Sequence, residues 1–548
     1  MRRDLATLTS RTFDLLVIGG GIYGAIAAWD ATLRGLRVGL IDRADFGGGT
    51  SFNSAKTLHG GVRALQSGNV AALRRFVRER RALCRIVPHL VRPLPFVVPT
   101  YRGITRNRTL LRLYFAINDL LARDRNDGIP VSRQLPPSRL LSRNECLDLN
   151  PLIDPDGVTG GMEWFDHQMH NSDRVHFSFI ASAVEDGAIA ANYVEARAGL
   201  TRGNTVEGVR ASDRLTGESL EIRAHIVLNA AGPWAPELAR RLASCDRGRL
   251  DGRLSKAMNF VMASPLRGSH AVAGPAAGRF LFIAPWREFA IAGTSYDSYD
   301  GSANGLALDR TEIERFIGTL REAFPGLSLE LGDLRLVHRG LLPVSPNGDG
   351  VRRRTISEIV DHRHDGLHGL ISMLGVRYTT ARDTAERAVD LAVRQLQRVA
   401  APCRTADTPL LGGDIPADVD DFMKEVTRPG DGPISPETRR RLACTYGTRH
   451  RQVLGMLTSS KTDRVPLGST CAVTAGEIRY AVREEMAVRL ADALLRRTEA
   501  GSAGYPGEDA VFSAAGIMAE ALDWTQERID TEIADVRGAY RLPGQPDR

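Results

Sequence analysis

Near its start, the chain carries an apolar run, a cluster of glycines and a second apolar run. Residues 13–18 (Phe-Asp-Leu-Leu-Val-Ile) predict a buried parallel strand, a helix is expected from about Ile22 to Leu33, and Arg37 to Ile41 predict another strand. Farther along, short apolar strands alternate with loops: Ala224–Leu228, Asn259–Met262, Arg279–Ala284, Phe289–Ala292 and Gly369–Leu374. The βαβ opening and these later strands predict an α/β fold in which a Rossmann-like domain is interleaved with a second, sheet-based domain.

The pattern changes from about residue 400. Residues 401–431 are rich in Pro, Gly and Asp and predict a linker or loop. In Glu477–Arg497 apolar residues recur every four positions, and Glu485 precedes Arg489 by four, so we expect one helix with an apolar stripe and a surface ion pair. The stripe consists of Ile478, Val482, Met486, Leu490 and Leu494. We predict two regions: 1–400, with sheet-based parts roughly over 80–160 and 250–345, and an all-helical domain over 401–548 that ends in a frayed tail, Leu542–Arg548.

Length and composition indicate an ordinary globular protein. The 548 residues are too many for one compact core, and the apolar (43%) and charged (25%) fractions are typical of soluble proteins. The six cysteines include no CxxC pair, which argues against a disulfide framework and a metal site and fits a reducing, cytoplasmic compartment. The net charge of +7 is spread along the chain rather than gathered in one patch, so we expect no nucleic-acid partner.

The first residues have some features of a signal peptide. Met1-Arg2-Arg3 precede an apolar stretch, but Asp14 and several glycines interrupt it, which a signal peptide does not require. No run of about 18 uninterrupted apolar residues occurs elsewhere, so we expect no transmembrane helix.

The glycine cluster has the spacing G-x-G-x-x-G at Gly19, Gly21 and Gly24. The first glycine permits a tight turn, the second lets the backbone approach a pyrophosphate, and the third lets helix and strand pack closely. Asp42 ends the second strand 23 residues after Gly19, where a carboxylate is expected to accept hydrogen bonds from an adenosine ribose. The N-terminal unit is therefore predicted to bind a dinucleotide, either NAD or FAD.

Two further segments distinguish these cofactors. Gly47–Gly61 is dense in Gly, Ser and Thr, and Val227–Trp234 is a strand that ends in a small-residue turn. Both resemble segments that run along the extended dinucleotide in the glutathione-reductase-like FAD-binding family, which favours FAD. The resemblance implies cofactor contacts by Thr50, Ser51, Gly60, Gly61, Ala231, Gly232, Gly375, Thr379 and Thr380, besides Gly19, Gly21, Gly24 and Asp42.

Several motifs together resemble the FAD-dependent glycerol-3-phosphate dehydrogenases and oxidases. They are His59-Gly-Gly-Val-Arg63, Asn229-Ala-Ala-Gly-Pro-Trp234, Ala284-Pro-Trp286, Thr379-Thr380, Ile478–Met486 and Arg496-Arg-Thr498. This resemblance spans nearly the whole chain. It implies an enzyme that oxidises the secondary alcohol of a small anionic, phosphorylated polyol such as glycerol 3-phosphate to the ketone. A hydride would pass to flavin N5, and the electrons would then pass to a quinone or to oxygen.

The resemblance also implies catalytic residues. His59 would orient the substrate hydroxyl or accept its proton, although it could equally serve only as a hydrogen-bonding residue of the cofactor loop. Arg63 would bind the substrate anion, the alternative being a surface salt bridge. Arg377 stands at a lysine of the family, Arg339 could supply a displaced cation with His338 beside it, and Lys256 completes the predicted catalytic set.

The chain departs from the family at positions expected near the substrate. Ala64 replaces an aromatic residue, Leu342 an arginine, Arg377 a lysine and Ala55 a serine. Loss of an arginine from an anion site suggests a changed substrate. Two alternatives therefore stay open: a related flavoenzyme acting on a different hydroxy or amino compound, and a flavoprotein without catalysis that serves as a binding partner.

The stretch from Arg102 to Arg123 mixes arginines with Leu110, Leu111, Leu113, Tyr114 and Phe115. Two interpretations are open: peripheral contact with the inner face of a membrane, and a helix packed on the domain with solvated arginines. The sequence favours the second. A homodimer also stays open.

Overall fold

The computed structural model describes residues 1–102, 107–243, 250, 252–276, 279–344, 356–416, 418–428 and 433–544. The last four residues of the predicted frayed tail lie outside the described residues, as do residues 103–106 of the arginine- and leucine-rich stretch.

The predicted βαβ opening is confirmed. β1 (Thr12–Ile18) leads through the glycine turn into α2 (Ile22–Leu33) and then β2 (Val38–Ile41), which pairs parallel with β1. On the other side β1 pairs parallel with β10 (Ser219–Asn229). β1 and β2 are almost wholly buried, as expected of a parallel sheet covered on both faces.

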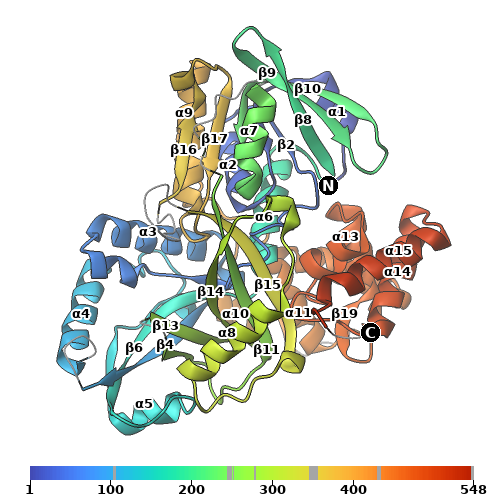
Figure 1. Cartoon of the computed structure of the whole chain (residues 1–548). Helices are drawn as coiled ribbons and strands as arrows, with labels where there is room; N and C mark the ends of the chain where they lie inside the picture. Colours follow the sequence, from blue (N-terminus) through green and yellow to red (C-terminus); the bar gives the residue numbers. More distant parts are fainter. Residues whose placement is uncertain are drawn as a thin grey trace.

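The described residues place eight strands in this first sheet (Figure 1). Its main path runs β16-β17-β10-β1-β2-β7, and β8 and β9 extend it through antiparallel pairs. The remaining strands are β7 (Ile189–Ala191), β8 (Val194–Arg202), β9 (Thr205–Asp213), β16 (Glu358–Asp361) and β17 (Leu370–Leu374). α2, α6 (Ser172–Glu185) and α9 (Ala381–Leu396) pack on one face, and α7 (Ala235–Ala243) packs on the other.

A second sheet is built from two separate parts of the chain. Within the described residues it has nine strands, in the order β15-β11-β14-β13-β12-β4-β6-β3 with β5 beside β6. They are β3 (Thr57–Leu58), β4 (Val91–Tyr101), β5 (Arg139–Leu141), β6 (Val158–Met169), β11 (Leu254–Ala263), β12 (Ala271–Ala276), β13 (Arg279–Trp286), β14 (Phe289–Tyr299) and β15 (Leu334–Pro343). α8 (Arg310–Ala323) covers one face through an apolar cluster, while the other face turns toward the first sheet.

The C-terminal region is a helical domain, as predicted, and it also contains one short pair of strands. Its helices are α10 (Val419–Val426), α11 (Pro436–Tyr446), α12 (His450–Ser459), α13 (Ala475–Glu484), α14 (Glu508–Leu522) and α15 (Gln526–Tyr540). Between them β18 (Pro466–Gly468) pairs with β19 (Cys471–Thr474).

The single helix predicted over Glu477–Arg497 was wrong. α13 ends at Glu484, Met486 adopts a left-handed φ of 56°, and a short π-helix follows over Asp492–Arg497. The Asp492 carboxylate accepts hydrogen bonds from the Val488 and Arg489 backbones and so starts the new turn. Glu485 does not pair with Arg489, because it forms a buried ion pair with Arg174 of α6 instead. Tertiary contacts thus outweigh the helical pattern.

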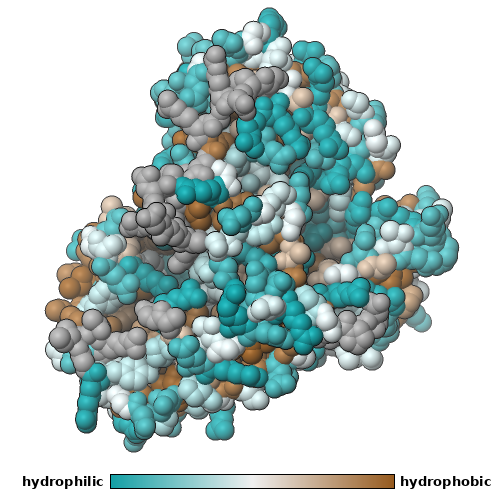
Figure 2. All heavy atoms as spheres, viewed as in Figure 1, coloured by the Kyte–Doolittle hydropathy of each residue, from teal (hydrophilic) through white to brown (hydrophobic). Residues whose placement is uncertain are grey.

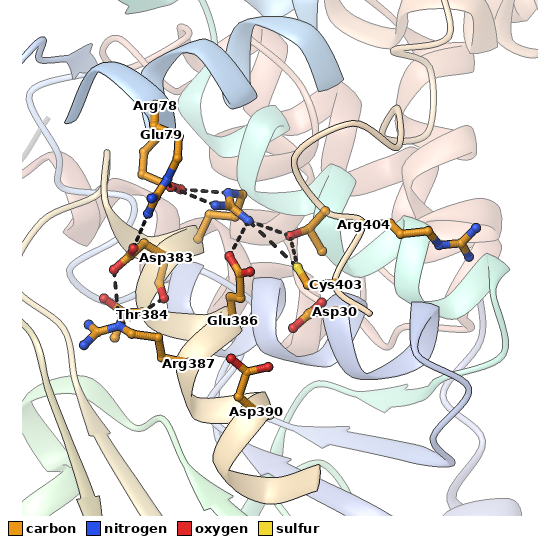
Figure 3. A network of polar contacts seen from close by, with 12 residues as sticks. Asp30, Arg78, Glu79, Asp383, Thr384, Glu386, Arg387, Asp390, Cys403 and Arg404 are labelled. Atoms are coloured by element: carbon orange, nitrogen blue, oxygen red, sulfur yellow. Dashed lines mark hydrogen bonds and ion pairs between the residues drawn. The ribbon is translucent and has the colours of Figure 1, made fainter. Parts of the chain in front are cut away.

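Ionic contacts hold α3 (Val70–Ile86) against α9 (Figure 3). Arg382 of α9 pairs with the fully buried Glu79 of α3 at 2.7 Å and donates a 3.1 Å hydrogen bond to Thr405. Arg78 pairs with Asp383 at 2.5 Å. Because a buried charge is tolerated only when paired, these contacts hold the start of α9, which follows Thr379 and Thr380, at a defined distance from α3.

Candidate active site

A cavity of about 1300 Å³ lies between the two sheets. It exceeds the roughly 300–1,000 Å³ of most small-molecule sites, so it has room for a dinucleotide and a small substrate together. One end is lined by Asp42, Arg43 and Trp234, and the other by His59 and Arg63.

The glycine turn at the cavity wall has the geometry that the motif predicts. Gly19 has a φ of 105°, and a Cβ there would lie 2.6 Å from the carbonyl oxygen of Ala230. A Cβ on Gly24 would collide with the carbonyl oxygen of Gly19, so only glycine lets α2 approach β1 this closely. A Cβ on Gly21 would meet only the Ser51 hydroxyl, at 3.3 Å, and this face opens to the cavity. The start of α2 thus offers backbone N–H groups to an anion.

Asp42 lies at the end of β2 and lines the cavity beside this turn. Its carboxylate accepts hydrogen bonds from the backbones of Gly20 (2.7 Å) and Ala44 (2.9 Å). Loss of hydration raises the pKa of Asp42 to about 6, even though both hydrogen bonds favour the charged form. At the same end, the Arg43 guanidinium lies 4.2 Å from the centre of the Trp234 ring, which provides a flat, mixed aromatic and cationic surface.

Most of the predicted cofactor residues line this one cavity. They are Gly19, Gly21, Asp42, Thr50, Ser51, Gly61, Ala231, Gly232, Gly375, Thr379 and Thr380. Gly24 and Gly60 lie just behind the wall: Gly24 packs on Gly19, and the Gly60 backbone donates a 2.7 Å hydrogen bond to Asp166.

His59 projects into the other end of the cavity and is about half exposed. Its Nδ1 lies 3.5 Å from the carboxylate of Asp166, and its backbone N–H donates to the Thr379 hydroxyl at 3.3 Å. Asp166 is buried and is held by Arg80 at 2.5 Å. Sequence reasoning missed Asp166 and Arg80; a carboxylate within the apolar run Trp164-Phe-Asp was the available signal.

Two of the predicted cations line the same end of the cavity. Arg63 donates to the carbonyl of Phe280 at 3.4 Å and lies 5.5 Å from the centre of the Phe282 ring. Arg377 lies 5.0 Å from the centre of the Phe76 ring, and its backbone is fixed by the hydroxyl of Tyr23. Sequence reasoning did not single out the other arginines that line the cavity, which are Arg43, Arg75, Arg197, Arg241, Arg279 and Arg387.

Lys256 and Arg339 do not line the cavity, in contrast to the prediction for both. The Lys256 ammonium pairs with Glu312 of α8 and donates to the Ala307 carbonyl at 2.8 Å. Ala257 lines the cavity, and adjacent residues of a strand point to opposite faces, so Lys256 faces α8. Arg339 is likewise adjacent to the cavity-lining Gly340.

The four positions at which the chain departs from the family pattern all lie at the cavity, where they could contact a substrate. Ala55, Ala64, Leu342 and Arg377 all line the cavity. His338 does not: it is fully buried against the Phe52 ring, and burial lowers its pKa well below the usual value.

Comparison with known proteins matches residues 14–382 to the family described as FAD dependent oxidoreductase. Residues 403–529 match the C-terminal domain of alpha-glycerophosphate oxidase. The chain belongs to the FAD-dependent oxidoreductase family.

Similar proteins cover nearly the whole chain. The chain is 30% identical to a glycerol-3-phosphate dehydrogenase of Synechocystis sp., over 97% of each chain. It is 31% identical to one of Mycobacterium leprae, over 98% of this chain and 90% of that one. The structure of glycerol-3-phosphate dehydrogenase from Bacillus halodurans complexed with FAD superposes with a TM-score of 0.76 at 26% identity, covering 98% and 96% of the two chains. FAD is therefore the cofactor of this oxidoreductase.

The cavity of this FAD-dependent oxidoreductase fits the cofactor on its own geometry. The glycine turn forms a cradle that side chains would fill, and the buried hydroxyl of Ser54 lines the cavity without a hydrogen-bond partner among the described residues. The start of α2 would hold the pyrophosphate, and Asp42 the adenosine ribose. The flavin would then extend toward His59.

Proposed function

We propose that the protein oxidises the secondary alcohol of a small anionic polyol to a ketone, with glycerol 3-phosphate as the first candidate substrate. The observation that supports this most directly is the constellation at one end of the cavity: His59 backed by Asp166, with Arg63 and Arg377 lining the same space. The family membership and the names of the similar proteins point the same way.

FAD supplies the hydride acceptor. His59 receives the proton of the substrate hydroxyl: its Nδ1 faces Asp166, which leaves Nε2 to accept that proton. Asp166 orients the ring and stabilises the imidazolium that forms, as a carboxylate behind a catalytic histidine does. The oxidised carbon loses one hydride and its hydroxyl one proton, so the product is the ketone.

Arg63 binds the anionic group of the substrate, and Arg377 contributes positive potential. Both guanidinium groups lie against aromatic rings, which restrict their orientation and reduce the entropy lost on binding. Thr379 connects the segment after Arg377 to the backbone of His59.

Leu342 supports a second candidate function, oxidation of a different hydroxy or amino compound. It faces the cavity at the position where the family resemblance places an arginine, and Ala64 leaves room where an aromatic residue is expected. Both changes make this wall less polar. They favour a substrate with fewer charges, or with an apolar substituent on that side.

We also propose that α4 (Arg108–Leu121) contacts a membrane surface, from which a quinone could take the electrons. Its outer face exposes Leu110 (48%), Leu113 (58%), Ile117 (43%) and Leu120 (67%), and brown residues gather at the left edge of Figure 2, where Figure 1 places this helix. Arg108, Arg112 and Arg123 are exposed beside them. An apolar stripe flanked by arginines suits an anionic lipid surface.

The position of α4 adds support to this proposal. Tyr114 on its inner face donates a hydrogen bond to the carbonyl of Val62, the residue before Arg63. The helix thus adjoins the end of the cavity assigned to the substrate. In the described part of the chain no helix is long and apolar enough to cross a membrane, so the contact would be peripheral.

Anaerobic mixing with a substrate panel tests the function. The FAD-loaded protein is mixed with glycerol 3-phosphate, glycerol, hydroxy acids, other polyol phosphates and amino acids, and the absorbance of oxidised flavin is followed. Bleaching by a phosphorylated polyol supports the first candidate, bleaching only by another class supports the second, and no bleaching by any compound contradicts both.

A further inference from the structure

Arg496 and Arg497 of the C-terminal domain form ion pairs with the loop over residues 42–55. Residues 42–55 form much of the cavity wall, and within them the Asp45 side chain is 1% exposed. Its Oδ1 accepts from Arg497 Nη2 at 2.6 Å, and its Oδ2 accepts from Arg497 Nη1 at 2.9 Å and Arg496 Nε at 2.5 Å. Charge-assisted, bidentate pairs of this kind are stronger and more specific in geometry than neutral hydrogen bonds.

The two guanidinium groups are fixed in turn by their own surroundings. Arg497 is fully buried, donates from Nε to the Glu485 carbonyl at 2.9 Å and lies 4.2 Å from the centre of the Phe177 ring. Arg496 also pairs with Asp492 at 2.8 Å. The break at Met486, which the helical pattern did not predict, allows the π-helix to point both arginines at this loop.

Asn192 connects the same parts from the side of the first sheet. Its amide donates 3.1 Å hydrogen bonds to Asp45 and to the carbonyl of Met486. Burial by itself would raise the pKa of Asp45, but the positive charges of Arg497 and Arg496 outweigh burial and hold that pKa below its usual range. The carboxylate therefore stays charged, and the contact persists across the physiological pH range.

A short chain of contacts leads from Asp45 to the glycine turn. Gly47, two residues later, donates its backbone N–H to the carbonyl of Gly20 at 3.0 Å. His176 of α6 donates from Nε2 to the same carbonyl at 2.7 Å, and a Cβ on Gly47 would lie 2.7 Å from the His176 ring. A displacement of the loop at Asp45 would therefore move the backbone that meets the pyrophosphate.

We propose that Arg496 and Arg497 are positioning residues for the cofactor: they hold residues 42–55 against the glycine turn, and so make FAD affinity depend on the C-terminal domain. Neither side chain lines the cavity, so the effect is exerted through Asp45. The domain is thus part of the cofactor site, in addition to any other role.

Arg497→Met tests this proposal, with Arg441→Met as the matched control. Arg441 also forms a bidentate pair with a buried glutamate, Glu477, but this pair lies within the C-terminal domain and away from the loop. Each full-length variant is stripped of FAD and titrated back with FAD, following flavin fluorescence, and the melting temperature of each apoprotein is measured separately.

We expect Arg497→Met to raise the Kd for FAD by about tenfold or more, the scale on which loss of a contact supporting a bound group acts. Arg441→Met should lower the apoprotein melting temperature yet leave the Kd within about twofold. Arg497→Lys, which keeps the charge, should give an intermediate Kd. An unchanged Kd in Arg497→Met, or an equal rise in both variants, would overturn the proposal. If Arg497→Met does not fold, Arg496→Met, whose side chain is 13% exposed, provides the same comparison.

Discussion

The Asp166 carboxylate lies 3.5 Å from Nδ1 of His59, because Asp166 lies on β6 and His59 directly follows β3, the strand that pairs with β6. Arg80 and the Gly60 backbone fix the carboxylate from its other side. In the proposed mechanism, His59 therefore acts together with Asp166.

Asp166→Asn is expected to slow flavin reduction by roughly a hundredfold, the lower end of what a positioned proton acceptor contributes. The amide keeps the shape but no longer favours the imidazolium. Stopped-flow measurement at saturating substrate checks this. The double variant with His59→Gln should be no slower than His59→Gln alone; a further additive loss would show that the two residues act independently.

Gly24→Ala is expected to lower the stability of the apoprotein, whereas Gly21→Ala is expected to prevent FAD binding. The Cβ at residue 24 collides with the Gly19 backbone, so this variant should lower apoprotein stability, typically by about 1–3 kcal/mol for overpacking. The Cβ at residue 21 meets little protein and points into the pyrophosphate space, so this variant should melt normally and retain no FAD. A yellow, FAD-loaded Gly21→Ala protein would contradict the cofactor placement.

Leu342→Arg is expected to improve turnover of glycerol 3-phosphate. A charge-assisted contact contributes about 1.5–3 kcal/mol, which corresponds to a fall in KM of roughly tenfold to a hundredfold. Glycerol, which lacks the anion, serves as the control substrate. If turnover improved equally with both compounds, or with neither, Leu342 would not determine the choice of substrate.

The raised pKa of Asp42 predicts opposite effects of pH on the stability of the apoprotein and on its affinity for FAD. Its pKa is about 6 in the folded protein, against about 4 when unfolded, so its contribution to apoprotein stability is present below pH 4 and lost as the pH rises through 6. FAD needs the ionised carboxylate as a hydrogen-bond acceptor, so its Kd should rise as the pH falls below 6. Titrations from pH 5 to pH 8 measure this, and Asp42→Asn should remove the dependence. A steep slope retained in Asp42→Asn would assign it to another group.

Leu113→Glu combined with Leu120→Glu is expected to release the protein from phosphatidylglycerol vesicles. Each leucine contributes about 1.5–3 kcal/mol when buried, so sedimentation with vesicles should weaken by at least tenfold for the pair. Val131→Glu, at an exposed residue outside α4, should have no effect. Flavin reduction in solution should be unchanged in both variants. Equal vesicle binding by wild type and the double variant would exclude α4 as the contact.

Local patterns were sufficient for the dinucleotide-binding unit. The apolar run, the glycine spacing and Asp42 all lie within one short segment, and its strand and helix form where predicted. Three strands of the second sheet, β11, β13 and β14, also form where their apolar residues predict them.

The arrangement of side chains at the site could not be predicted from local patterns, because it depends on contacts between residues far apart in the sequence. Lys256 and Arg339 were predicted by residue type, but the alternation of strand faces directs Lys256 toward α8, and Arg339 stays outside the cavity lining. Asp166 contacts His59 over 107 positions of sequence. The break at Met486 follows from ion pairs and caps with partners in other elements, so no pattern within Glu477–Arg497 contained it.

The interleaving of the two sheets has a consequence for biosynthesis. β1 pairs with β10, which in turn pairs with β17. Asp45 pairs with Arg496 and Arg497, which follow it in the sequence by 451 and 452 positions. The chain must therefore be synthesised to Arg497 before the nucleotide-binding unit can form all of these contacts. We expect nascent chains arrested before Arg496 to capture flavin poorly, and the emerging strands to need protection from aggregation until synthesis ends.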